Sequence, residues 1–331
     1  MTSDQERLIS IVRSFPKRKL VIVGDAIADR FLFGSISRVS REAPVFILRH
    51  EQTETVPGGA ANCAVNLASL GAEVSLVSVV GNDEAGRELR DKLAKAGVDT
   101  NCLLTSDKIQ TTTKVRILAG QTHSSRQQVI RIDYEGEPLS DGELHELLLQ
   151  KLKGCCTEAD AVIVSDYNYG VVGDREIEFL RTFARPVLVD SRFRLANITG
   201  FTAATPNEDE LEHLVEQPIE SKEQLESAAT ALKRKLQHKA LLVTRGANGM
   251  MLLEDDTAPF HIAAVGAQQP VDVTGAGDTV IATFALALAS NASFEDSTRL
   301  ANYAGGLVVM KRGTAAVTAH EVEHSIINSE L

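Results

Sequence analysis

One segment of the chain places a carboxylate beside a glycine-rich turn, directly before an apolar stretch. Residues 271–279 read VDVTGAGDT, and the apolar residues that follow predict a helix over 275–289. Small residues at a helix start leave the first backbone N–H groups exposed, and the helix dipole adds positive partial charge, so the turn can bind a phosphoryl group. Asp278 could accept a proton from an attacking hydroxyl. A capped turn with Thr274 as N-cap explains the same spacing, and the residues alone leave both interpretations open.

Two more segments place polar groups where a sugar could bind. Gly58 and Gly59 open a predicted helix over 59–70 and would let the backbone approach a ligand, with Asn62 one turn further on. Asp25 follows the first predicted strand, where a carboxylate can accept hydrogen bonds from two sugar hydroxyls. Helix–sheet packing is the stronger explanation for the glycine pair taken alone, and a solvated turn explains Asp25 equally well.

A fourth segment has residues that could bind a metal–phosphate complex. Residues 205–210 read TPNEDE, so Asn207 and Glu210 lie three residues apart on one face of a predicted helix. An amide and a carboxylate in this arrangement suit water-mediated binding of Mg²⁺. An N-cap followed by acidic residues is the stronger explanation for an isolated match.

These segments must be positioned by an alternation of short apolar runs and longer helical stretches. The predicted strands are 20–24, 74–80, 161–165, 187–190, 240–244 and 250–253, and the predicted helices are 59–70, 84–96, 141–152, 174–183, 222–237, 275–289 and 294–311. Such strand-then-helix units predict an α/β fold with a mostly parallel sheet covered on both faces. Right-handed crossovers bring the loops at the carboxyl ends of the strands to one edge, where open α/β sheets bind ligands.

Residues 31–52 and 111–133 break this alternation, because they read as strands without helices between them. Their spacing, for example at Val115 and Ile117, is that of a half-exposed ribbon, which predicts a small separate sheet. Such a sheet would be a lid over the ligand edge, a surface for homodimerisation, or both. No internal repeat or linker divides the chain, so we expect one domain over 1–331 with this lid inserted.

Composition excludes several classes of protein and partner. A chain of 331 residues with 44% hydrophobic residues can bury a large core and is neither disordered nor collagen-like. Its net charge of −11 would repel the phosphates of nucleic acids and anionic membranes, so we expect neither as a partner. The four cysteines lack metal-ligand spacing, and the N-terminal residues lack a secretory signal pattern, which predicts a reduced, cytoplasmic protein.

Taken together, the segments from about residue 20 to about residue 318 resemble the ribokinase (PfkB) family of sugar kinases, in the family's order. The resemblance implies a ribokinase-like three-layer α/β/α fold with a small inserted β lid. It also implies transfer of the γ-phosphoryl group of ATP to a sugar hydroxyl, with Mg²⁺ as cofactor and K⁺ as an activator that some members use. It makes Asp278 the base that deprotonates the acceptor hydroxyl, and the amides of Gly275, Ala276 and Gly277 the anion hole.

The same resemblance assigns the remaining site residues by position. Those implied to contact ATP or its metal are Asn207, Glu210 (to Mg²⁺ through water), Thr244, Arg245, Gly246, Gly249 and Asn302. Those implied to bind the sugar are Asp25, Gly58, Gly59 and Asn62, and those implied to hold a monovalent cation are Asp272 and Thr274.

Within the family, the chain is most similar to the kinase domain that phosphorylates heptose 7-phosphate in bacterial ADP-heptose synthesis. The segments SRVSREAPV (37–45), TKVR (113–116) and SDY (165–167) carry this likeness. It implies a phosphorylated sugar that contacts Lys114, Arg116 and Asp166, although a solvated strand face is the stronger explanation for either basic residue alone. Asn168-Tyr169 and Ser191-Arg192 depart from the lysine-containing pairs expected there, which bears on the substrate more than on the reaction.

Three alternatives stay open at this point. One is a kinase of the same family for a ribose-, fructose- or tagatose-type sugar or sugar phosphate. Another is a sensor that binds sugar or nucleotide on the same fold without catalysis, which the complete set of implied catalytic residues disfavours. The third is a Rossmann-type oxidoreductase, which the missing early GxGxxG motif disfavours.

Overall fold

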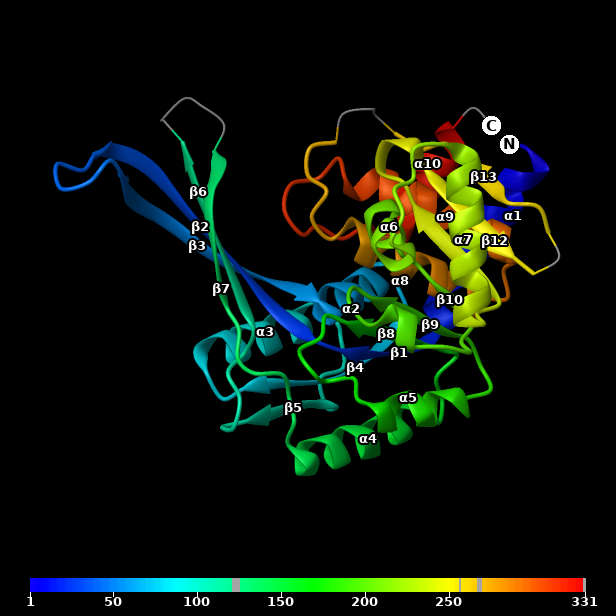
Figure 1. The fold of residues 1–331 in the computed structure, drawn as a ribbon, viewed down its shortest axis with the longest axis horizontal. Coiled ribbons are helices and arrows are strands. Elements are labelled where there is room, and N and C mark those ends of the chain that lie inside the picture. The colour runs from blue at the N-terminus through cyan, green and yellow to red at the C-terminus, as the bar shows by residue number, and fades with distance from the viewer. Residues whose placement is uncertain (121–125, 256, 267–269, 330–331) are drawn as a thin grey trace.

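The computed structural model describes residues 1–120, 126–255, 257–266 and 270–329, and it contains two sheets (Figure 1). The larger has nine strands in the order β13-β12-β11-β10-β9-β8-β1-β4-β5. Its strands are β1 (Lys19–Gly24), β4 (Glu73–Gly81), β5 (Leu103–Ser106), β8 (Ala161–Asp166), β9 (Val187–Ser191), β10 (Ala203–Ala204), β11 (Ala240–Thr244), β12 (Met250–Glu254) and β13 (Phe260–Ile262). All pair in parallel except β12 and β13 at one edge, which pair antiparallel.

Helices cover both faces of the larger sheet. Successive strand residues point to opposite faces, and because both sets are apolar, each face must be buried. Leu20 and Ile22 pack in one core, whereas Val21 and Val23 pack in the other. The first core is covered by α1 (Ser3–Val12), α2 (Ala60–Ser69), α3 (Glu84–Lys95), α8 (Ala276–Ala289), α9 (Phe294–Val308) and α10 (Ala319–Asn328). The second is covered by α4 (Gly142–Cys156), α5 (Asp174–Arg181), α6 (Glu208–Val215) and α7 (Lys222–Leu236). Short 3₁₀ helices are η1 (Phe15–Lys17), η2 (Leu195–Asn197) and η3 (Gly246–Asn248). The predicted three-layer α/β/α fold is confirmed.

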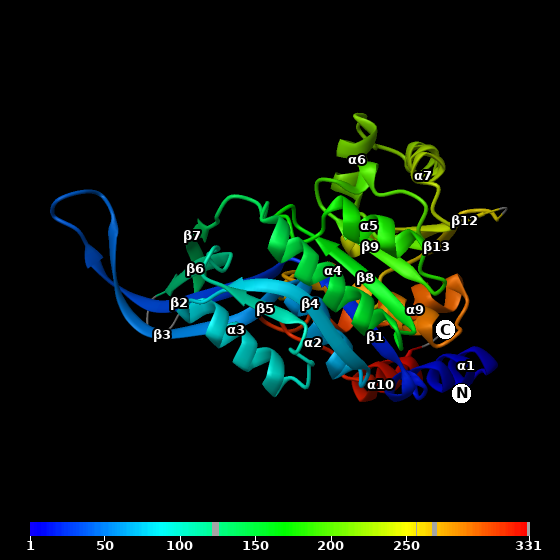
Figure 2. The same cartoon turned by 90° about the horizontal axis from the view of Figure 1, so that it is seen from below.

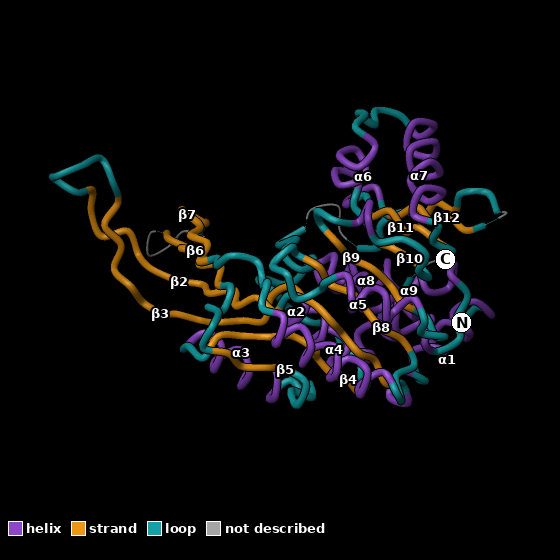
Figure 3. The backbone as a smooth tube through the Cα atoms, turned by 60° about the horizontal axis from the view of Figure 1, so that its bottom comes forward, coloured by secondary structure: helices purple, strands orange, loops and turns teal. Residues whose placement is uncertain are grey.

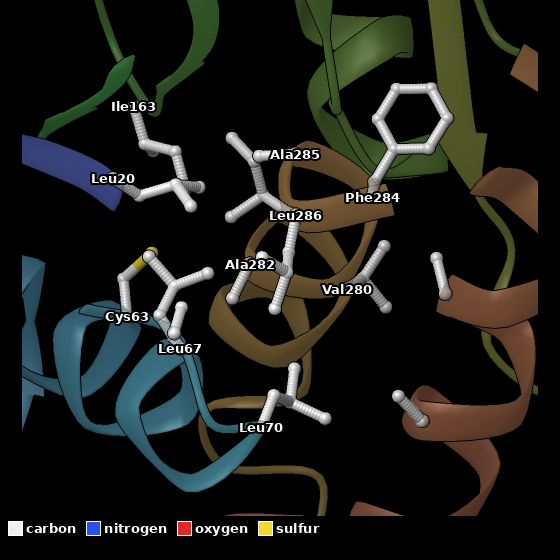
Figure 4. Close-up of a cluster of buried hydrophobic side chains, with 14 of the residues drawn as sticks. Leu20, Cys63, Leu67, Leu70, Ile163, Val280, Ala282, Phe284, Ala285 and Leu286 are labelled. Carbon is white, nitrogen blue, oxygen red and sulfur yellow. The ribbon is translucent and has the colours of Figure 1, made fainter. Parts of the chain in front are cut away.

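The two helices that begin at glycine-rich turns pack together in the first core. Figure 4 shows side chains of α2, among them Cys63 and Leu67, meeting Ala282 and Leu286 of α8. Nearly every side chain of α8 is buried, as expected for a helix that is apolar on all sides. Because this packing is dense, the starts of α2 and α8 are held at fixed positions relative to each other.

The smaller sheet has four strands in the order β3-β2-β6-β7. Its strands are β2 (Ala26–Val39), β3 (Phe46–Gly59), β6 (Thr113–Gly120) and β7 (Gln127–Tyr134). It projects from the body in Figures 1 and 2, and Figure 3 shows its far end without a covering helix. The predicted small sheet is confirmed, but β2 and β3 reach inward to Ala26 and Gly59, and β2 pairs with β6 in parallel.

The predicted strands and helices of the body are all present, with ends that differ by a few residues. The prediction missed the short strands β5, β10 and β13 and the terminal helices α1 and α10. A strand of two to four residues, such as β10, has too few positions to show a period. No helix in the described part of the chain is both long and apolar enough to cross a membrane.

Candidate active site

Polar residues gather where the parallel strands end. Asp25 follows β1, Asp166 closes β8 and Asp190 lies near the end of β9. Asn207 follows β10, and its backbone bridges to Thr244 at the end of β11. Because parallel strands carry their carboxyl ends to one edge, residues far apart in sequence meet there.

Asp278 lies in the first turn of α8 and is buried. Its Oδ2 accepts a hydrogen bond of 2.7 Å from Nδ2 of Asn62, and its Oδ1 accepts one of 3.2 Å from the hydroxyl of Tyr167. Burial raises the pKa of Asp278 to about 7, against the opposing effect of these two hydrogen bonds, and the charge of Asp29 adds to the rise. A carboxylate with this pKa is suited to accept a proton near neutral pH.

Gly275 and Gly59 make the two turns that bring the helix starts together. Gly275, the N-cap of α8, has a φ of +76°, and a Cβ there would lie 2.5 Å from Nδ2 of Asn62. Gly59, the N-cap of α2, has a φ of +55°, and a Cβ there would lie 2.7 Å from the carbonyl oxygen of Asp25. Both positions therefore require glycine for backbone conformation and for space.

Asp25 is buried, and both of its carboxylate oxygens accept hydrogen bonds from one loop. The backbone amides of Tyr167, Tyr169 and Val171 donate to it at 2.7, 3.2 and 3.2 Å. Burial raises the pKa of Asp25 to about 6, the nearby charge of Asp166 adds to this, and the three amides oppose it. Asp25 therefore anchors the loop that follows β8, besides facing the edge where its predicted sugar contact would form.

Asp166, predicted to bind substrate, is buried in contacts with its own surroundings. Its Oδ2 accepts a hydrogen bond of 2.7 Å from the hydroxyl of Ser191, and its Oδ1 accepts one of 3.1 Å from the amide of Asn168. The guanidinium of Arg194 lies 3.8 Å away and also donates to the carbonyl of Val172. These contacts hold the ends of β8 and β9 together.

Two basic residues of β6 face the body from the smaller sheet. Arg116 pairs with Asp29 and lies over the ring of Phe31. The ammonium of Lys114 lies 6.0 Å from the ring centroid of Tyr167 and 5.6 Å from that of Tyr169. Lys114 forms no hydrogen bond or ion pair with the part of the chain that the structure describes, and partial burial lowers its pKa. It is therefore a cation available to an anionic ligand.

On the nucleotide side, Asn207 and Glu210 form a capping box at the start of α6. Oδ1 of Asn207 accepts from the amide of Glu210 at 2.8 Å, and Oε2 of Glu210 accepts from the amide of Asn207 at 3.0 Å. Burial raises the pKa of Glu210. The two residues therefore cap α6, as the N-cap explanation of this segment predicted. The second carboxylate oxygen of Glu210, Oε1, takes no part in this pair of hydrogen bonds.

The other predicted nucleotide residues lie on neighbouring loops and on α9. Gly246 and Gly249 belong to the turn between β11 and β12, and Arg245 donates to Glu208 at 3.2 Å. Asn302 is buried on α9 and donates to the carbonyl of Ala263 at 2.7 Å. The first contact joins the turn to α6, and the second joins α9 to the segment that follows β13.

Sequence reasoning missed Asp190. Burial raises its pKa well above the ordinary value, and the negative charges of Asp278, Glu210 and Asp166 add to the rise, with Arg192 opposing. Asp190 could be assigned to this group of carboxylates only once the position of β9 beside β8 in the sheet was known. Within the described residues, no three His, Cys, Asp or Glu side chains converge to hold a metal ion by themselves.

Asp272, predicted to hold a monovalent cation, connects two loops beside the start of α8. Its carboxylate accepts hydrogen bonds of 2.9 Å from the amides of Thr274 and Gly313. Burial works against ionisation, but these bonds outweigh it and lower the pKa of Asp272. Nearby, Oγ1 of Thr314 is buried without a hydrogen-bond partner among the described residues, so an unsatisfied oxygen lies close to the predicted cation position.

Comparison with known proteins agrees with this fold. The model of the pfkB family of carbohydrate kinases matches residues 17–321, and the chain belongs to this family. It is 40% identical over 315 residues to the bifunctional protein HldE of Coxiella burnetii and 40% identical over 316 residues to that of Nitrosococcus oceani. These matches cover 94% of the chain but 64% of the length of those relatives.

Solved structures show the same fold at lower identity. Arabidopsis thaliana ribokinase complexed with ribose and ATP matches with a TM-score of 0.74 and 23% identity, over 94% of this chain and 99% of that one. Phosphofructokinase-2 from Escherichia coli in complex with fructose-6-phosphate matches with a TM-score of 0.77 and 18% identity, over 94% and 98%. The chain is a carbohydrate kinase, a phosphotransferase that acts on a sugar hydroxyl.

Proposed function

We propose that this kinase phosphorylates heptose 7-phosphate to heptose 1,7-bisphosphate, a step in ADP-heptose synthesis in the cytoplasm. The observation that carries a phosphorylated substrate is Lys114, a partly buried ammonium without an ionic partner in the described chain, beside the loop that Asp25 anchors. The similarity to HldE over 94% of the chain supports the choice of sugar.

In the proposed reaction, the sugar lies between Asp25, Asn62 and the smaller sheet, with one hydroxyl facing Asp278. Asp278 accepts the proton of that hydroxyl as the oxygen attacks the γ-phosphorus of ATP, and the bond to the leaving ADP oxygen breaks in line. The amides of Gly275, Ala276 and Gly277 then stabilise the charge on the transferring group. The smaller sheet acts as a lid that keeps water, a competing acceptor, from the site.

Two cations fit the residues present. Glu210 would hold Mg²⁺ through water, and Asp190 adds a second carboxyl group to the same edge, which suits a metal that retains waters and phosphate oxygens. The metal would neutralise charge on the phosphates of ATP. Asp272 and Thr274, together with the unsatisfied hydroxyl of Thr314, would hold K⁺ beside the anion hole.

The experiment that tests this function is ADP release from ATP·Mg²⁺ with a panel of sugars and sugar phosphates. We expect heptose 7-phosphate to give the highest kcat/KM. Faster turnover of a ribose-, fructose- or tagatose-type acceptor would contradict the proposed substrate and leave a kinase of different specificity. ATP binding without turnover of any acceptor would instead favour the sensor.

Replacing Lys114 by methionine should raise the KM for the sugar phosphate by about tenfold or more, because one charge-assisted contact to phosphate contributes about 1.5–3 kcal/mol. The KM for ATP should stay within about twofold of wild type. The matched control is Lys153→Met, because the ammonium of Lys153, on α4, also lies over a ring, that of Phe179 on α5. An unchanged KM for the sugar phosphate in Lys114→Met would remove the main support for a phosphorylated substrate.

We also propose that the protein forms a homodimer through the smaller sheet. Ile130, Ile132 and Tyr134 of β7 are 51%, 40% and 48% exposed, an apolar strip on a strand whose residues are all exposed. Replacing Ile130 and Ile132 together by lysine should convert the dimer to a monomer in analytical ultracentrifugation. A wild-type monomer, or a variant that stays dimeric, would contradict this interface.

A further inference from the structure

The hydroxyl of Tyr167 contacts Asp278, yet none of the sequence motifs assigns Tyr167 a role. The bond of 3.2 Å joins it to Oδ1, the carboxylate oxygen that Asn62 does not contact. Burial and the charge of Asp278 raise the pKa of Tyr167 well above its ordinary value, so the phenol stays protonated and donates. Each oxygen of Asp278 thus has one donor and keeps a lone pair for an incoming proton.

Two carboxylates, those of Asp25 and Asp166, fix the backbone at and next to Tyr167. Asp25 accepts a hydrogen bond of 2.7 Å from the backbone amide of Tyr167 itself. Asp166 accepts one of 3.1 Å from the amide of the next residue, Asn168, which has a φ of +66°. The loop is therefore fixed at consecutive residues, and the phenol is directed at Asp278 by a backbone with little freedom to move.

We propose that Tyr167 is a positioning residue for Asp278, whose hydroxyl orients the carboxylate toward the acceptor hydroxyl and stabilises its ionised form. This inference rests on the proposed role of Asp278 as the proton acceptor. It also gives Asp25 a second task, because Asp25 holds the loop that carries Tyr167.

The groups around Asp278 determine how much the hydrogen bond from Tyr167 matters for its ionisation. The charge of Asp29 disfavours ionisation of Asp278, and the charge of Asp278 in turn raises the pKa values of Asp190 and of the buried thiol of Cys63. The ammonium of Lys114, a residue of β6, lies 6.0 Å from the centroid of the Tyr167 ring. Within this set, the hydrogen bonds from Asn62 and Tyr167 are the contacts that favour the ionised form.

The test is the pH dependence of kcat/KM in Tyr167→Phe. Loss of a hydrogen bond to a charged group should move the acid limb upward by about one pH unit, and from a pKa of about 7 this lowers kcat at pH 7 by about fivefold. The KM values for sugar and ATP should stay within about twofold of wild type. An unmoved acid limb, or a higher sugar KM with unchanged kcat, would overturn the proposal.

The matched control is Tyr303→Phe, because Tyr303 is also buried and its hydroxyl also has one partner, Ser329, 2.7 Å away. This variant measures the general effect of losing a buried hydroxyl, and its acid limb should coincide with that of wild type. Titration of the Asp278 carboxyl by ¹³C NMR, assigned with Asp278→Asn, requires no turnover. A higher pKa in Tyr167→Phe would support the positioning role even if no acceptor were phosphorylated, and an unchanged pKa would refute it even if the kinase were active.

Discussion

Replacement of Asp278 by asparagine is expected to lower kcat by about a thousandfold, the usual contribution of a positioned general base. Asparagine keeps the size of the side chain and can still contact Asn62 and Tyr167, but it cannot accept the proton of the sugar hydroxyl. ATP binding should be retained, because the predicted nucleotide residues lie on α6, α9 and the β11–β12 turn. Steady-state ADP release and ATP titration calorimetry measure the two effects, and substantial turnover in the variant would exclude Asp278 as the base.

Thermal stability distinguishes the loss of kcat in Asp278→Asn from a loss caused by unfolding. The pKa of Asp278 is about 7 in the folded protein and about 4 in an unfolded chain. Between these values the folded state binds more protons, so its stability falls as pH rises from about 4 to about 7 and does not recover above. Asn carries no charge and avoids this cost. Asp278→Asn should therefore unfold at a higher temperature than wild type at pH 8, and the difference should shrink as pH falls toward 4.

Replacement of Gly275 by alanine is expected to have the second largest effect, a fall in kcat of about a hundredfold. The new Cβ would lie 2.5 Å from Nδ2 of Asn62, and a φ of +76° costs alanine about 1–2 kcal/mol. Relief of this strain moves the start of α8 or displaces Asn62, and a misplacement of about 1 Å in a catalytic group can cost about a hundredfold in rate. Thermal unfolding and steady-state kinetics on the same preparation measure both consequences.

Gly154→Ala is the control for adding a methyl group to a glycine. Gly154 lies in the last turn of α4, far from the site in sequence, and its added Cβ would have no atom within 4 Å. Activity should match wild type, and stability should be equal or higher by up to about 1 kcal/mol, because alanine favours a helix over glycine. Full activity in Gly275→Ala would mean that the turn before α8 does not hold the base in place.

Local patterns in the sequence determined the class of fold and the two glycine-rich helix starts. The alternation of apolar strands and helices depends on neighbours within about ten residues, which is why the body strands and the separate small sheet could be predicted. Asp278 at the start of an apolar helix was also a local feature, because a helix start and its first turn are adjacent in the chain.

The environment of that carboxylate was decided by the tertiary structure. Asn62 and Tyr167, which donate hydrogen bonds to Asp278, are 216 and 111 residues away from it in the sequence. Patterns among neighbouring residues cannot predict contacts over such separations. Asp25 was predicted as a ligand for sugar, yet its oxygens also anchor a loop that begins beyond the end of β8. Asp190 joined the site only because β9 lies beside β8. Burial and hydrogen bonding depend on which strands and helices become neighbours. Burial raises the pKa of an aspartate toward neutrality and hydrogen bonds to its carboxylate lower it, so the tertiary structure, more than residue type, sets the pKa of Asp278.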